Sequence, residues 1–80
     1  MKHKAQKRVL ASYQTIFRTD QGKEVLNDLI KAHWVNTSTF DANPQLMALR
    51  EGERNVVLRI LTLLGIGEHE LSDMLRDKGE

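Results

Sequence analysis

The stretch from Asn43 to Gly65 constrains the fold most strongly, because it carries the longest unbroken helical pattern in the sequence. Asn43 is a favoured residue immediately before a helix, and Pro44 suits the first helical position, where the backbone N–H has no partner. Gly65 is typical of the residue after a helix, where the backbone becomes left-handed. The pattern predicts a helix over residues 44–64.

Most apolar residues of this stretch project from one broad face at 100° per residue. They are Leu46, Leu49, Val56, Val57, Ile60, Leu61, Leu63 and Leu64. Met47 and Leu58 project from another side, beside Arg54. A helix that is apolar on more than one side usually lies centrally in a bundle or contacts a partner chain. We therefore predict an interface that contains Met47, Arg54, Leu58 and Arg59.

Phe40 is the single large apolar residue in the polar segment 36–43, which reads as a loop. We expect its ring to close the end of the core. The alternative is an exposed anchor for a partner, which would add Phe40 to the interface.

Glu53 projects near the middle of the broad apolar face. A carboxylate there must find a hydrogen-bond donor or remain protonated. Arg18, Arg50 and Arg54 are the candidate donors, so we predict a buried ion pair at Glu53 with a structural role.

The remaining elements are also helical. Residues 4–18 carry an apolar stripe of Val9, Leu10, Tyr13, Ile16 and Phe17. Thr19 is a candidate cap for a helix over 20–35, in which Gly22 suits a close approach between helices. A short helix is expected over 68–77. The fold class is therefore all-α: a small three-helix bundle with a short fourth helix, forming one domain over residues 1–80.

The charges are unevenly distributed, although the net charge is only +1. Residues 1–24 hold six basic and two acidic residues, whereas residues 67–80 hold two basic and five acidic ones. Lys4, Lys7 and Arg8 could make a weak contact with nucleic-acid phosphates. Residues 53–77 have the outline of a helix-turn-helix, but the acidic segment 68–77 lacks the side chains that read bases, so we reject that role.

No catalytic machinery is recognisable in the sequence. There is no cysteine, and His3, His33 and His69 do not form a zinc-binding pattern. We therefore expect no enzyme activity, no cofactor, no metal site and no small-molecule substrate. The first residues are basic without a following apolar segment, so we expect no signal peptide, and we expect no membrane span because no apolar run is long enough.

One series of residues between positions 13 and 64 forms a recognisable pattern, whose most specific segment is Phe17 to Leu29. The series is Tyr13, Phe17, Thr19, Gly22, Val25-Leu26, Asp28-Leu29, Phe40, Arg50-Glu51-Gly52, Arg54, Val56 and Leu58-Arg59-Ile60. With this pattern the sequence resembles a family of small, functionally uncharacterised helical phage proteins. Members are typically encoded among the portal, capsid and tail genes of short-tailed phages. The resemblance implies a virion or virion-assembly protein but no catalytic residue.

Two hypotheses follow from the sequence. The first is a non-enzymatic phage structural or assembly protein of the portal, head–tail or internal core region. It would contact other phage structural proteins or further copies of itself, in the virion or in the infected bacterial cytoplasm. The second is a small phage regulator that binds nucleic acid or a host protein through its basic first helix.

Overall fold

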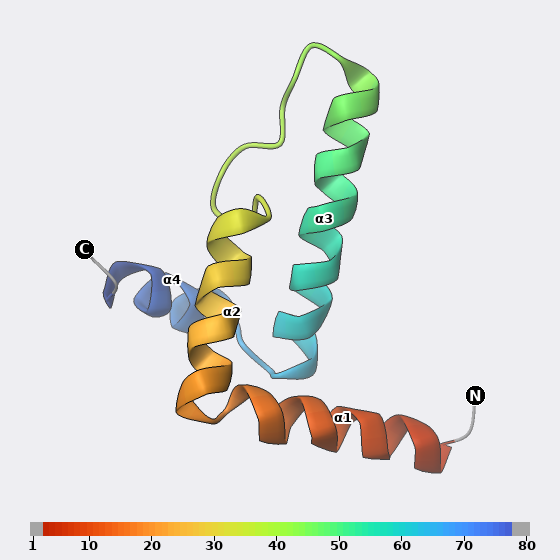
Figure 1. The fold of residues 1–80 in the computed structure, drawn as a ribbon, viewed down its shortest axis with the longest axis vertical. Coiled ribbons are helices and arrows are strands. Elements are labelled where there is room, and N and C mark those ends of the chain that lie inside the picture. Colours follow the sequence, from red (N-terminus) through yellow and green to blue (C-terminus); the bar gives the residue numbers. More distant parts are fainter. Residues whose placement is uncertain (1–2, 78–80) are drawn as a thin grey trace.

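The computed structural model describes residues 3–77, and this part of the chain folds into four helices with no strand (Figure 1). They are α1 (His3–Phe17), α2 (Asp20–Ala32), α3 (Pro44–Leu63) and α4 (Glu68–Asp77). The predicted all-α class is therefore confirmed.

The core lies between α2 and α3, which run side by side and are joined by a long loop (Figure 1). Its buried members are Leu26 and Ile30 from α2, Val57, Ile60 and Leu61 from α3, and Leu64 just after α3. Tyr13 and Phe17 of α1 and Leu71, Met74 and Leu75 of α4 pack around this cluster as half-buried side chains. Two helices thus supply the core, and the other two contribute to its edges.

The helices are not all aligned with one another. Figure 1 shows α1 lying across the lower ends of α2 and α3, with its N-terminal part extending beyond α3. The molecule measures 43 × 36 × 20 Å, and its radius of gyration is 14.2 Å. A compact chain of this length has a radius of gyration of about 12 Å. The three-helix bundle is therefore not confirmed, and the molecule is flat.

Local side-chain chemistry determines where α2 and α3 begin, as predicted. The Thr19 Oγ1 accepts a hydrogen bond from the backbone N–H of Gly22 at 2.9 Å. The Asn43 Oδ1 accepts from the N–H groups of Gln45 and Leu46, at 2.9 and 3.3 Å. Such caps satisfy donors that have no partner within the first helical turn. Each cap depends on residues within three positions of it.

Gly65 ends α3 as predicted, with a φ of +72°. The Gly65 N–H donates to the Thr62 carbonyl and the Ile66 N–H donates to the Leu61 carbonyl, each at 3.0 Å. These bonds satisfy carbonyl groups of the last turn. The chain then reverses into α4, which has the predicted bounds.

The end of α2 differs from its prediction by three residues. The helix ends at Ala32 rather than at residue 35, because the backbone turns at His33 and Trp34 has a φ of +70°. A bulky side chain rarely adopts this left-handed conformation. The contacts that hold Trp34 there come from α3 and are described below.

Gly22 allows α1 and α2 to meet at their junction. A β-carbon at Gly22 would lie 1.9 Å from the Ile16 carbonyl oxygen and 2.8 Å from the Phe17 α-carbon. These atoms belong to the backbone of the last turn of α1. The predicted close approach is therefore confirmed, and it sets how α1 lies across the α2–α3 pair.

Within residues 3–77, no helix is both long enough and apolar enough to cross a membrane.

Candidate interaction surface

The predicted interface residues of α3 do not form one exposed patch. Met47 and Leu58 are half-buried, and Leu58 packs against the core cluster. The Arg54 guanidinium lies 4.0 Å from the Glu51 carboxylate, one helical turn away. These three residues lie on the side of α3 where the chain already makes contacts of its own.

Arg59 connects α3 to α1. Its Nη1 donates to the Tyr13 hydroxyl at 3.3 Å, and its guanidinium lies 5.7 Å from the centre of the Tyr13 ring. Arg59 is nevertheless exposed. It therefore stabilises the position of α1 while part of the side chain remains accessible.

The exposed apolar residues of α3 are Leu49, at 59% exposure, and Val56, at 63%. The sequence placed both on the broad face expected to be buried. That face is wider than the single helix, α2, that packs against it. Helical periodicity identifies an apolar face but not how much of it a neighbour covers, so this second surface was missed.

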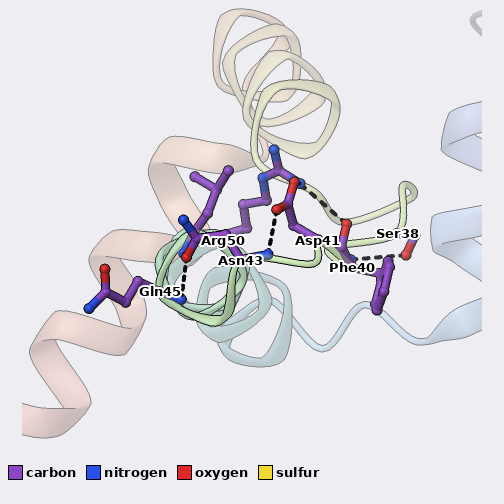
Figure 2. Close-up of polar contacts among 7 residues, drawn as sticks. Ser38, Phe40, Asp41, Asn43, Gln45 and Arg50 are labelled. Carbon is purple, nitrogen blue, oxygen red and sulfur yellow. Dashed lines mark hydrogen bonds and ion pairs between the residues drawn. The ribbon is translucent and has the colours of Figure 1, made fainter.

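Phe40 is 73% exposed, so the expectation that its ring closes the end of the core is wrong. Its backbone is held on both sides: the N–H donates to Ser38 Oγ at 3.1 Å, and the carbonyl accepts from Arg50 Nη1 at 3.3 Å. Arg50 also lies 3.4 Å from the Asp41 carboxylate. Figure 2 shows the Phe40 ring turned away from these polar groups. The exposed Phe40 ring is therefore available for the alternative role, an anchor for a partner.

Glu53 has different partners from those predicted, and its side chain is 37% exposed rather than buried. Its Oε1 accepts from Trp34 Nε1 at 3.1 Å and lies 3.1 Å from His33 Nδ1. The expected arginines point elsewhere: Arg18 donates to the Leu64 carbonyl at 2.8 Å, and Arg50 lies over the Trp34 ring. The donors come from the end of α2, which the sequence placed inside a longer helix.

These contacts explain the conformation of Trp34. Its indole N–H is bonded to Glu53, and the Arg50 guanidinium lies 4.4 Å from the ring centre. A cation over a tryptophan face contributes about 0.5–1 kcal/mol at an exposed site. The left-handed backbone costs about 1–2 kcal/mol for a residue with a β-carbon. Contacts from α3 thus offset the free-energy cost of the left-handed backbone at Trp34. The sequence of α2 alone does not contain these contacts.

Replacing Glu53 distinguishes its charge from its hydrogen bond. Glu53→Gln keeps an oxygen acceptor for the Trp34 N–H, so we expect its free energy of unfolding to stay within about 0.5–1 kcal/mol of wild type. Glu53→Ala removes the acceptor and should cost about 1–2 kcal/mol. Urea titrations followed by tryptophan fluorescence would measure both. Equal losses in the two variants would show that the negative charge, not the acceptor, stabilises this junction.

The basic first helix has an accessible surface of its own. Lys7 and Arg8 are exposed, and a shallow groove beside Arg8 runs past Val9 and Ser12 to Ile16. Lys4 belongs to α1, but its side chain lies outside the described part of the structure. The helix contains no acidic residue. It therefore presents positive charge next to apolar side chains.

Several open hollows lie on the described part of the chain. A cavity of about 290 Å³ lies where α1, α2 and α4 meet, lined by apolar side chains together with Arg18, Lys23, Asn27 and Glu70. Two larger hollows measure about 520 Å³ along the polar side of α2 and about 420 Å³ between residues 35–39 and α3. Among residues whose positions are described, no three His, Asp or Glu side chains gather as metal ligands do.

Comparison with known proteins adds one finding. A family model described as Bbp19-like phage protein matches residues 13–76, from Tyr13 in α1 to Arg76 in α4. No curated protein and no solved structure matches the chain. The match covers the residues that carry the resemblance noted in the sequence and extends it through α4.

Proposed function

The chain belongs to the Bbp19-like phage protein family, and from that membership we propose that it is a non-enzymatic component of the phage particle or of its assembly. It acts through contacts between helix faces, with other phage structural proteins or with further copies of itself. Its place is the virion or the infected bacterial cytoplasm, and the portal, head–tail or internal core region suits a small helical protein.

The observation that carries this proposal, beyond family membership, is the surplus of exposed apolar side chains on a flat molecule. Leu49, Val56 and Phe40 are each more than half exposed, whereas six of the described residues form the buried core. Small chains bury a low share of their surface and gain stability by docking on a partner. The predicted contacts of Met47, Arg54, Leu58 and Arg59 belong to the same proposal.

Recovery of the protein from purified particles tests the proposal. Particles from infected cells would be purified by density gradient, and the protein would be quantified by mass spectrometry against a portal or capsid standard. We expect a fixed copy number per particle, or a defined number in assembly intermediates. Absence from both, with the protein present in the lysate, would contradict this function.

The basic, acid-free surface of α1 favours a second candidate, a small regulator that contacts nucleic acid or a host protein. Phosphate contacts by Lys4, Lys7 and Arg8 would make DNA affinity fall steeply with salt, by about one power of salt concentration per phosphate. Binding should then be lost when the three are replaced by Gln. Fluorescence anisotropy with duplex DNA at several salt concentrations measures this. Affinity unchanged in the triple variant would exclude this use of α1.

A further inference from the structure

A second apolar stripe runs along α3, separate from the stripe that packs on α2. Its central residues are Leu49, Gly52 and Val56. The full stripe extends in both directions from these residues, and its members are separated by four and three residues in turn. Gln45, Leu49, Gly52, Val56, Arg59 and Leu63 are its members, and we call them the α3 seam. This spacing places side chains along one line of a helix, as in helices that pack lengthwise against another helix.

The seam continues into an apolar groove between α2 and α3. The groove has a volume of about 240 Å³, and its lining includes Leu29, Val56 and Ile60, with the His33–Glu53 pair among its polar members. Leu49 and Val56 stand exposed on the seam. α3 therefore presents apolar surface that no other described part of the chain covers.

Gly52 lies in the middle of this stripe, and no contact within the described chain requires a glycine there. A β-carbon at Gly52 would meet no atom within 4 Å, unlike one at Gly22. Glycine is unfavourable inside a helix, so a central glycine needs a compensating contact. A second helix that crosses α3 at Gly52 would supply one, because the missing side chain lets the two backbones approach closely.

The exposed area of the chain is also larger than its mass requires. Its accessible surface is 6033 Å² for 9.2 kDa. Folded monomers of that mass expose about 4,900 Å², so the surplus is about 1,100 Å². A stable interface buries about 800 Å² per partner. The surplus is larger than the area that one such interface covers, so the chain exposes enough extra surface for one partner.

We propose that the α3 seam is the interface with a second copy of this chain, in an antiparallel, two-fold pair that crosses at Gly52. The inference rests on the proposed function and names one surface and one partner for it. The two-fold axis sets Val56 of each copy beside Ala48 and Leu49 of the other. A two-fold interface needs such self-complementarity, and the seam has it because Leu49 and Val56 flank Gly52 almost symmetrically.

Repulsion between like charges favours an antiparallel pair of α3 helices over a parallel pair. Gln45 and Arg59 lie seven residues before and seven residues after Gly52. An antiparallel pair places the Arg59 guanidinium of one copy opposite the Gln45 amide oxygen of the other, and it does so at both ends. A parallel pair would instead place the two Arg59 guanidinium groups together, where like charges repel.

Sedimentation equilibrium of the full chain over a hundredfold concentration range tests this pairing. We expect a reversible dimer. Val56→Glu should weaken self-association by about a hundredfold or more, because it places two carboxylates in an apolar interface. Thr62→Glu adds the same charge to an exposed position of α3 that projects about 100° from the seam, and it should leave the dimer intact. A strict monomer, or a dimer equally stable in both variants, would overturn the proposal.

Gly52→Ala gives an independent test that does not risk misfolding. In the dissociated chain the added methyl group meets open space, so helix propensity should raise the melting temperature by about 4–8 °C. In the dimer the two methyl groups meet at the crossing, so we expect self-association to weaken by about tenfold or more. A variant that is both more stable and equally dimeric would contradict a crossing at Gly52.

The two proposals can fail separately. A monomer present at fixed copy number in particles would overturn the paired seam and leave the particle function standing. A monomer whose Val56→Glu variant is missing from particles would also overturn the second-copy pairing and would assign the seam to another phage protein. A seam-dependent dimer absent from particles and from assembly intermediates would support the pairing and contradict the particle function.

Discussion

Gly22→Ala is expected to unfold the domain or to destabilise it by about 3 kcal/mol or more. The new β-carbon would lie 1.9 Å from the Ile16 carbonyl oxygen and 2.8 Å from two backbone carbon atoms of Ile16 and Phe17. These atoms cannot move without shifting the end of α1, so overpacking outweighs the gain of about 1 kcal/mol that alanine brings to a helix. For 80 residues, this loss lowers the melting temperature by more than about 12 °C.

Gly52→Ala is the matched control for this prediction, because the same change is made in a second helix where the added methyl group has open space. Circular dichroism melts at a concentration where the chain is dissociated should show opposite signs for the two variants. If Gly22→Ala melted at or above the wild-type temperature, the close approach of α1 and α2 would not be a constraint on the fold.

Ile30→Ala is expected to cost about 2–5 kcal/mol, the range for truncating a fully buried aliphatic side chain. Ile30 has 0% exposure, and it belongs to a buried cluster between α2 and α3 that has six members among the residues whose burial is described. Because so few residues form this core, little neighbouring structure is available to fill the space left by three carbon atoms. The loss is a large fraction of the total stability expected for a domain of this size.

Val25→Ala provides the comparison for Ile30→Ala, because it removes apolar atoms from the same helix at a position that is 52% exposed. Its loss of burial is small and is offset by the better helix propensity of alanine, so we expect a change within about 0.5 kcal/mol. Urea titrations would give both values. Similar losses at the two positions would show that the core is not centred between α2 and α3.

The starts of α2 and α3 and the end of α3 were predictable from the sequence because each depends on nearby residues. Thr19 and Asn43 satisfy N–H groups two or three positions further along, and Gly65 adopts the left-handed conformation that glycine tolerates. The end of α2 was not predictable in this way. Trp34 is held by Glu53 and Arg50, which follow it by 19 and 16 residues and belong to α3.

The candidate interaction surface, like the helix ends, was only partly predictable from the sequence. The sequence identified α3 as a helix with more apolar surface than one core needs, and this follows from periodicity alone. It assigned the outer surface to Met47 and Leu58, whereas the exposed apolar residues of α3 are Leu49 and Val56. Each pair lies along one line of the helix, so the choice between the two lines depends on the direction from which α2 approaches.

The sequence by itself determined that this chain is helical, where α2 and α3 begin, where α3 ends, the bounds of α4, and which helix carries surplus apolar residues. These properties arise from contacts within one or two helical turns. Only the tertiary structure decided that the close approach at Gly22 is to the backbone of α1, that Glu53 binds the end of α2, and which side of α3 stays exposed. Each of these depends on how two helices lie relative to one another, and periodicity within a single helix contains no information about that.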